Sequence, residues 1–345
     1  MKIGEFDGPA PGESIRLTVK VGEWADGSPM SLPVLAVRGK SDGPVLWLNA
    51  LVHGDEINGA VAALKAVTSL KTQDFRGTVV CSPVSNPLAY NARQRTSFTD
   101  NLDLDQLFPG VQGGLTTQRI AHRLFSMIKT TATHVISFHS VGAPMTSYAY
   151  AVFKNVPSAD AAVVAESARM ALAFGVRVNC MVDVATATGE LPGQLSGSLD
   201  LACIDNGIPS FMAEVGGGAR LQEESTTRGI RGIRRVMRVL GMLPATAHPD
   251  GPVPPDSERI VITKRRFLMA DRGGLWEMAV KPEDIVQQGR SIGTITNWFG
   301  ESMEITAAHD MCMILLRANP AVHAGDRIAF IGTEWVPVEQ YHVKP

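Results

Sequence analysis

Cysteine is scarce in this 345-residue sequence, and none of its four cysteines forms a CxxC pair. Widely separated thiols argue against a disulfide framework and against a cysteine zinc site, so we expect reduced thiols in the core. Long apolar stretches are also missing: none reaches the length of a transmembrane helix, and the N-terminus lacks the apolar core of a signal peptide. Together these absences predict a cytoplasmic protein that has no membrane as a partner.

An excess of charge of one sign is missing as well. The net charge is −2 and the pI is near 6.5, so electrostatics give no reason to expect nucleic acid or an anionic membrane as a partner. The sequence also has no Gly-x-Ser-x-Gly motif, which is the nucleophile elbow of many serine hydrolases. Its absence argues against that class of enzyme.

The composition is that of an ordinary globular protein, with 45% hydrophobic and 19% charged residues. The length suggests two domains, or one large domain with an appendage. Residues 241–255 read GMLPATAHPDGPVPP, and their five prolines predict an extended connector because proline fixes φ and removes a backbone donor. We therefore predict one domain at residues 1–240, a Pro-rich connector at 241–258 and a β-rich C-terminal domain at 259–345.

Before the connector, short apolar strands alternate with amphipathic helices. The expected strands are Pro33–Val37, Val45–Ala50, Thr78–Cys81, His134–Phe138, Tyr148–Phe153 and Ser210–Val215. The expected helices are one after Glu56 with an apolar stripe from Ile57 to Leu70, one from an N-cap at Ser158 to Gly175, and Thr226–Leu240. This alternation predicts an α/β fold, in which a largely parallel or mixed sheet is covered on both faces.

Beyond the connector, the segments are short, rich in Ile, Val, Leu or Met, and separated by turns that contain glycine. They are Arg259–Thr263, Ser291–Thr296, Met311–Leu316 and Arg327–Ile331. Little room is left between them for helices. This pattern predicts a small antiparallel β domain.

Residue types that bind metal ions occur where the expected strands end. His53 and Glu56 follow a buried strand in the sequence VHGDE, His139 ends the strand HVISFH, and Glu214 lies late in SFMAEV. In open α/β sheets, the loops at such strand ends converge over a ligand crevice. Two histidines and one glutamate are a known ligand set for catalytic zinc. Each residue alone is more often structural, but their placement at separate strand ends predicts a metal site.

Four segments, in order along nearly the whole chain, resemble the succinylglutamate desuccinylase/aspartoacylase family, whose members are relatives of the zinc carboxypeptidases. The segments are the HGDE loop, the stretch NPLAYNARQRTSFTDNLDLDQLFPG, the SFHS sequence and GSLDLACIDNGIPSFMAEVGGG. The resemblance implies a three-layer fold, in which helices cover both faces of a mixed sheet. The C-terminal part, from GGLWEMAVKPEDIVQQGRSIGTI onward, resembles the β domain that is appended in this family and is related to biotinyl/lipoyl carrier folds.

The resemblance also implies roles for individual residues. His53, Glu56 and His139 match the ligands of one Zn²⁺ per chain. Glu214 matches the catalytic glutamate, which takes a proton from a metal-bound water and later delivers it to the leaving amine. Arg95 matches the arginine that stabilises the oxyanion. Together they imply a metal-dependent N-deacylase that cleaves an amide bond, other than a peptide bond, in a small N-acylated amine or amino-acid derivative.

One segment departs from the family pattern. The family usually has Asp-Leu-Asn-Arg where this sequence has Asp103-Leu104-Asp105-Gln106. The Asn-Arg pair is implied to hold a substrate carboxylate, for which an arginine fork is well suited. Asp105 would repel a carboxylate and Gln106 carries no charge, so we expect a substrate that lacks a carboxylate there or carries an amine or amide. Arg93 would share a face with Arg95 in an extended segment and is a further candidate for substrate binding.

Two other functions are compatible with the sequence. A non-catalytic ligand-binding or regulatory member of the same fold is one, with the altered Asp105-Gln106 segment marking a pocket that only binds its ligand. A metallocarboxypeptidase is the other, although the loss of the Asn-Arg pair would remove the main anchor for a peptide's C-terminal carboxylate. A homo-oligomer is also compatible with the sequence.

Overall fold

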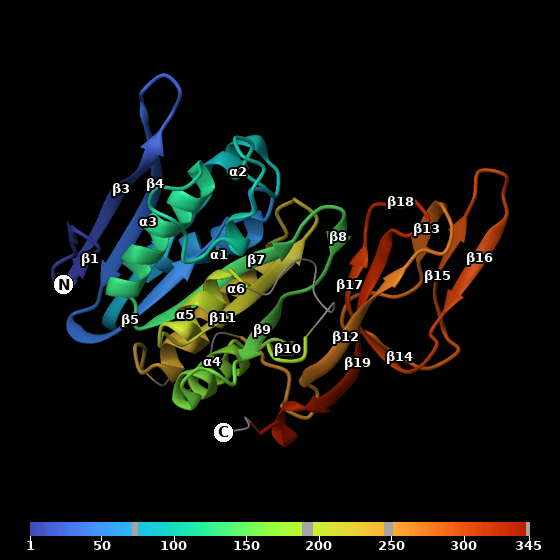
Figure 1. Cartoon of the computed structure of the whole chain (residues 1–345). Coiled ribbons are helices and arrows are strands. Elements are labelled where there is room, and N and C mark those ends of the chain that lie inside the picture. The colour runs from blue at the N-terminus through green and yellow to red at the C-terminus, as the bar shows by residue number, and fades with distance from the viewer. Residues whose placement is uncertain (71–74, 188–195, 245–250, 343–345) are drawn as a thin grey trace.

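The computed structural model describes residues 1–70, 75–187, 196–244 and 251–342. Figure 1 shows one large twisted sheet with helices packed against it, and the C-terminal strands, coloured orange to red, at one end of the molecule. The N-terminal strands β3 (Ser14–Glu23) and β4 (Pro29–Arg38) lie at the opposite end. No helix in these ranges is long and apolar enough to cross a membrane.

Within the described residues, the large sheet is mixed and has thirteen strands. In pairing order they are β14 (Ile285–Val286), β17 (Met311–Arg317), β19 (Arg327–Pro337), β12 (Ile260–Met269), β10 (Val178–Asp183), β9 (Tyr150–Asn155), β11 (Ser210–Gly217), β7 (His134–Val141), β5 (Ser41–Asn49), β6 (Arg76–Ser82), β4 and β3, with β8 (Met145–Thr146) beside β17. Strands β6, β5, β7 and β11 pair in parallel, and β9 pairs antiparallel to β11. The carboxyl ends of β5, β7 and β11 therefore meet at one edge of the sheet.

Helices cover both faces of this sheet. One face packs against α1 (Ile57–Ser69), α4 (Ala161–Ala173) and α6 (Glu223–Val239), and the other against α3 (Thr116–Thr131) and α5 (Leu199–Asp205). Short helical turns occur at α2 (Pro87–Ala92), η2 (Leu104–Gln106) and η3 (Val338–Gln340). Successive residues of β5 pack on opposite faces of the sheet: Leu46 and Leu48 lie in the apolar core on the first face, and Trp47 lies in the core on the second. The expected mixed α/β fold is confirmed.

Each of the six expected strands overlaps an observed strand, but β3, β10 and α5 were not predicted. The sequence of β3, SIRLTVKVGE, alternates apolar and polar residues, so its period-two signal was present. The N-cap of α4 is Asp160, whose side chain accepts a hydrogen bond from the Ala162 N–H, and not Ser158. Helix α6 begins three residues before the expected Thr226.

Helix α1 follows Glu56 as expected, and its expected apolar stripe is buried in part: Val67 and Leu70 lie in the core. Leu64, which was expected to face the core, is 39% exposed. The buried residues of the helix are mostly small: Asn58, Gly59, Ala60, Ala62, Ala63, Ala66 and Val67. A Cβ on Gly59 would lie 2.6 Å from the Cβ of Phe138 in β7. Close packing of the helix on the sheet therefore selects small side chains, and the buried face is turned away from Leu64.

Gly232 lies at a similarly close contact between α6 and α4. A Cβ at this position would lie 2.3 Å from Cε2 of Phe174, a ring that is completely buried. Alanine has the better helix propensity by about 1 kcal/mol. We nevertheless expect Gly232→Ala to lower the free energy of unfolding by about 1–3 kcal/mol, because the ring has no room to move away.

Chemical denaturation measures this difference. Gly113→Ala is the matched control, because nothing lies within 4 Å of the added Cβ. Its free energy of unfolding should stay within about 0.5 kcal/mol of the parent value. If Gly232→Ala proves as stable as Gly113→Ala, the tight contact with Phe174 is contradicted.

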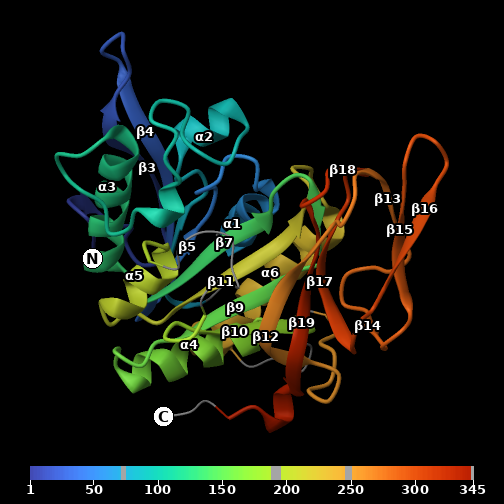
Figure 2. The same cartoon turned by 45° about the vertical axis from the view of Figure 1, so that its right-hand side comes forward.

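The C-terminal residues form short strands, as expected, but these strands belong to two sheets. Strands β12, β14, β17 and β19 continue the large sheet, because β12 pairs in parallel with β10. The second sheet contains β16 (Ser302–Thr306), β15 (Ser291–Thr296), β13 (Gly274–Met278) and β18 (Ala321–Val322), which Figure 2 shows away from the helices. The small β1 (Lys2–Ile3) and β2 (Phe6–Asp7) pair with each other in a separate two-stranded sheet. Part of the predicted connector, residues 245–250, lies outside the described residues.

Candidate metal centre and substrate cavity

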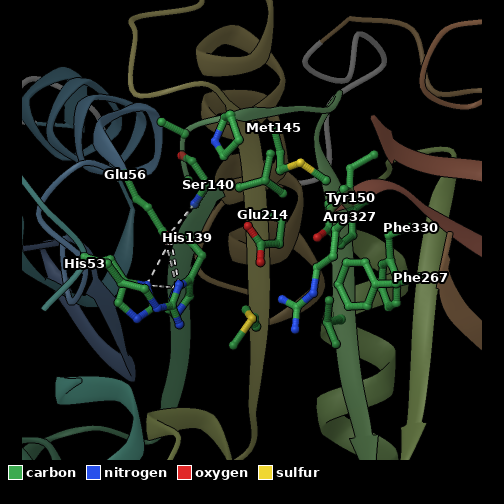
Figure 3. A pocket seen from close by; sticks show the side chains of 18 of the residues that line it. His53, Glu56, His139, Ser140, Met145, Tyr150, Glu214, Phe267, Arg327 and Phe330 are labelled. Carbon is green, nitrogen blue, oxygen red and sulfur yellow. Dashed lines mark hydrogen bonds and ion pairs between the residues drawn. The ribbon is translucent and has the colours of Figure 1, made fainter. Parts of the chain in front are cut away.

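Two histidines and a glutamate converge at the carboxyl ends of β5 and β7. His53 Nδ1 lies 3.0 Å from Oε1 of Glu56, and His139 Nδ1 lies 3.0 Å from Oε2 of the same carboxylate. The two Nδ1 atoms are 3.3 Å apart. All three side chains are buried, and one ligand atom from each lies within 4.8 Å of the others (Figure 3). The structure thus brings together the three predicted metal ligands.

The chemistry of this cluster fits a metal ion. Two imidazoles and one carboxylate are a known donor set for a catalytic ion that keeps one position open. Burial disfavours the charged form of His53, but the Glu56 carboxylate and the Asp103 hydrogen bond together raise its pKa to about 10. Burial by itself would raise the pKa of Glu56, and the two histidines lower it instead. The cluster therefore attracts positive charge to a buried position.

A second carboxylate holds the outer nitrogen of His53. Asp103 Oδ1 lies 2.9 Å from His53 Nε2, and Asp103 Oδ2 accepts a hydrogen bond from Arg95 Nε at 3.0 Å. Arg95 Nη1 also lies 3.5 Å from Oε1 of Glu56, while 48% of the Arg95 side chain remains exposed. Carboxylates in this position fix the tautomer and orientation of a metal-binding histidine. Asp103 was not predicted as a site residue, although it stands in the segment that departs from the family pattern.

Asp105 also contacts the metal cluster. Its Oδ1 accepts a hydrogen bond from the Leu199 N–H at 3.2 Å, and its Oδ2 lies 3.8 Å from His139 Nε2. Burial raises the pKa of the Asp105 carboxyl, although His139 and His53 act in the opposite direction. Gln106 is exposed and lines the cavity. The carboxyl group of Asp105, which was expected to repel a substrate carboxylate, therefore lies directly beside the cluster.

Glu214 faces the cluster from β11. It is paired with His139 in the register of β7 and β11, and its side chain lines the cavity (Figure 3). Its Oε2 atom is buried and has no hydrogen-bond partner among the described residues. Burial and the charge of Glu56 raise the pKa of Glu214 to about 7. Because a buried carboxylate oxygen without a partner is costly, this atom is placed to meet a water or a substrate group.

The cluster opens into a cavity of about 800 Å³. One wall is formed by β7, β9 and β11 and includes Tyr150 and Met212. The other wall comes from β12, β17 and β19 and includes Phe267, Arg327 and Phe330. Pockets of this size bind small molecules. The C-terminal strands therefore complete the cavity that the metal cluster opens into.

Arg93 does not share the cavity with Arg95. It is the C-cap of α2 and adopts a left-handed conformation with φ of 54°, so the segment is not extended as expected. Its side chain is exposed and is absent from the described residues that line the cavity. The expectation that the two arginines share a face is therefore wrong.

Lys154 and Asp200 were not predicted as site residues. They form an ion pair beside the cavity in which both side chains are almost completely buried, and Lys154 also donates a hydrogen bond to Ser198 at 3.2 Å. Burial would raise the pKa of Asp200, but Lys154 and Ser198 lower it. The two partners are 46 residues apart in the chain, and nothing near either of them in the sequence indicates the other.

The fold and the site define a mixed α/β protein with a buried His-Glu-His cluster at the ends of parallel strands. The sequence profile of the succinylglutamate desuccinylase/aspartoacylase catalytic domain matches residues 42–240, more than half of the chain. The matched segment contains the whole cluster and Glu214. The chain belongs to the succinylglutamate desuccinylase/aspartoacylase family.

Individual relatives are similar along nearly their whole length. An N-alpha-acetyl-L-2,4-diaminobutyric acid deacetylase from Halomonas elongata is 28% identical over 337 residues, which are 95% of this chain and 92% of the relative. The product-bound ectoine utilization protein EutE (DoeB) from Ruegeria pomeroyi has a TM-score of 0.78 at 22% identity, covering 93% of this chain and 95% of that one. A succinylglutamate desuccinylase/aspartoacylase from Rhodobacter sphaeroides has a TM-score of 0.77 at 23% identity, covering 94% of this chain and 96% of that one. These structures share the fold.

Proposed function

We propose that the protein is a zinc-dependent N-deacylase, which hydrolyses the amide bond of a small N-acylated amine or amino-acid derivative. The observation that carries this proposal is the buried cluster of His53, Glu56 and His139, with Glu214 beside it on the neighbouring strand. The cluster opens into a cavity of small-molecule size. The similarity to the Halomonas elongata deacetylase over 95% of this chain supports an amide bond other than a peptide bond as the bond that is cleaved.

In this proposal each residue of the site has one task. His53, Glu56 and His139 hold one Zn²⁺ per chain. A bound zinc ion supplies Lewis acidity and lowers the pKa of water to about 7. Glu214 accepts the proton of the attacking water through its unpartnered oxygen and later donates it to the leaving amine. Arg95, held by its hydrogen bond to Asp103, donates a hydrogen bond to the carbonyl oxygen of the substrate amide as that oxygen becomes negative.

The proposal extends to the rest of the molecule. Residues 1–240 would form the catalytic domain and residues 259–345 a carrier-like β domain that narrows access to the cavity and excludes polypeptides. A second sheet with its own apolar cluster around Trp276 and Ile292 supports such a C-terminal unit. Asp105 and Gln106 would bind a substrate group that is not a carboxylate. Four free, buried cysteines support a reducing compartment such as the cytoplasm.

Removal of the metal tests the proposed reaction. The purified protein should release acetate from N-α-acetyl-L-2,4-diaminobutyrate, or an acyl group from another member of a panel of small N-acyl amino acids. We expect turnover to be lost after treatment with a chelator and to return when Zn²⁺ is added, because the cluster binds the ion that activates water.

Addition of Mg²⁺ is the control, since this ion prefers oxygen ligands and should not restore turnover. Failure of the folded, zinc-loaded protein to cleave any N-acyl substrate would contradict the proposal. Binding of the same compounds without cleavage would then favour a non-catalytic member of the family.

A further inference from the structure

The basic side chains that line the cavity differ in how their charge is balanced. Three of them form ion pairs with neighbouring carboxylates: Arg95 with Asp103, Lys154 with Asp200, and Arg317 with Asp326. Arg327 forms no ion pair, and its guanidinium donates no hydrogen bond to any of the described residues. Its side chain is exposed at the cavity wall. Arg327 is therefore a cavity cation whose charge the described residues leave unpaired.

An aromatic pair holds the Arg327 guanidinium. Phe267 of β12 is paired with Phe330 of β19, and their rings stack with centroids 4.4 Å apart at an angle of 28°. The Cζ atom of Arg327 lies 4.4 Å from the centroid of the Phe267 ring. At this distance the guanidinium makes a cation–π contact with the ring. Its N–H groups donate no hydrogen bond to the described residues, and Figure 3 shows the side chain pointing into the cavity from the wall that carries the two rings.

The charges elsewhere in the cavity indicate what Arg327 binds. Near the metal cluster the cavity is lined by the carboxyl groups of Asp105 and Glu214, and the basic side chains there, Arg95 and Lys154, are already paired with Asp103 and Asp200. At Arg327 a carboxylate meets an unpaired guanidinium, which can bind it through two parallel N–H···O bonds. The Phe267 ring already restricts the side chain, which reduces the entropy lost on binding.

We propose that Arg327 is the residue that binds the carboxylate of an N-acyl amino-acid substrate. This inference rests on the proposed deacylase function and adds a residue that determines its specificity. The acyl amide lies at the His53–Glu56–His139 cluster, and the carboxylate lies at the wall formed by the C-terminal strands. Because β19 pairs with β12 and β12 pairs with β10, one continuous sheet connects the two walls and fixes their separation.

Arg327→Met tests this assignment with two probes, N-α-acetyl-L-2,4-diaminobutyrate and its carboxamide. Methionine keeps the apolar contact with Phe267 but removes the charge. We expect KM for the carboxylate probe to rise about 10- to 100-fold with little change in kcat, because a charge-assisted contact made in both the ground state and the transition state is lost. The KM for the carboxamide should be unchanged. For Arg327→Lys, KM for the carboxylate probe should fall between the values of the parent and Arg327→Met, since lysine keeps the charge but cannot donate two parallel hydrogen bonds.

Arg266→Met is the matched control, because Arg266 is exposed on the same strand as Phe267 and is absent from the described residues that line the cavity. Its KM for both probes should equal that of the parent. The inference is overturned if Arg327→Met raises KM equally for both probes, or for neither of them. It is also overturned if the parent protein uses the carboxamide as well as the carboxylate.

Calorimetric titration of the same two probes separates this inference from the proposed reaction. If the parent cleaves neither probe, the deacylase function fails, and binding alone then decides the role of Arg327. Tighter binding of the carboxylate probe, lost in Arg327→Met, supports the assignment. Binding of neither probe by the parent, or equal binding by parent and variant, overturns it.

Discussion

Replacement of Glu214 by glutamine is expected to lower kcat by about 10²- to 10⁴-fold, with the zinc content of the protein unchanged. Glutamine has nearly the same volume but cannot accept a proton. Glu214 lies outside the cluster of His53, Glu56 and His139, so the metal ligands stay in place. Steady-state kinetics on the cleaved N-acyl substrate and elemental analysis of the zinc-loaded variant measure the two quantities.

Glu277→Gln is the matched control for this variant. Glu277 is exposed in β13, in the second sheet, and the same chemical change there should leave kcat and zinc content at the parent values. Undiminished turnover in Glu214→Gln would assign proton transfer to another residue. Loss of zinc together with loss of turnover would instead show that Glu214 is needed to hold the metal.

Replacement of His53 and His139 by alanine is expected to abolish zinc binding. The parent should contain about one zinc per chain and the double variant none, because a single carboxylate is left of the three ligands. Zinc at a hundredfold excess over Kd should stabilise the parent by about 2.7 kcal/mol. The double variant should show no such stabilisation. Elemental analysis and thermal unfolding with and without zinc measure both effects without using activity.

His122→Ala combined with His323→Ala removes the same number of imidazoles from outside the cluster. Zinc content and the zinc-dependent rise in Tm should match those of the parent. Equal zinc binding by the variant without His53 and His139 would place the ion at another site. Absence of zinc from the parent, even after it is added and the excess is removed, would favour the ligand-binding alternative.

The metal ligands could be predicted from the sequence because their signal is local. His53 and Glu56 are three residues apart in one loop, and His139 and Glu214 each stand near the end of a recognisable strand. Parallel strands that end at one edge of a sheet bring such residues together whatever the rest of the chain does. The family resemblance then indicated a role for each of them. The structure has brought these residues together, and their roles await the variants described above.

The sequence by itself determined the alternation of strands and helices and the position of the metal-binding residues, because both follow from short-range periodicity and strand ends. Only the tertiary structure decided which residues of α1 are buried, that Lys154 meets Asp200, and that Arg327 lies on Phe267 at the wall of the cavity. These contacts join segments that are far apart in the chain. They depend on the order of strands in the sheet and on how closely the helices pack against it, and no local pattern of residues carries that information.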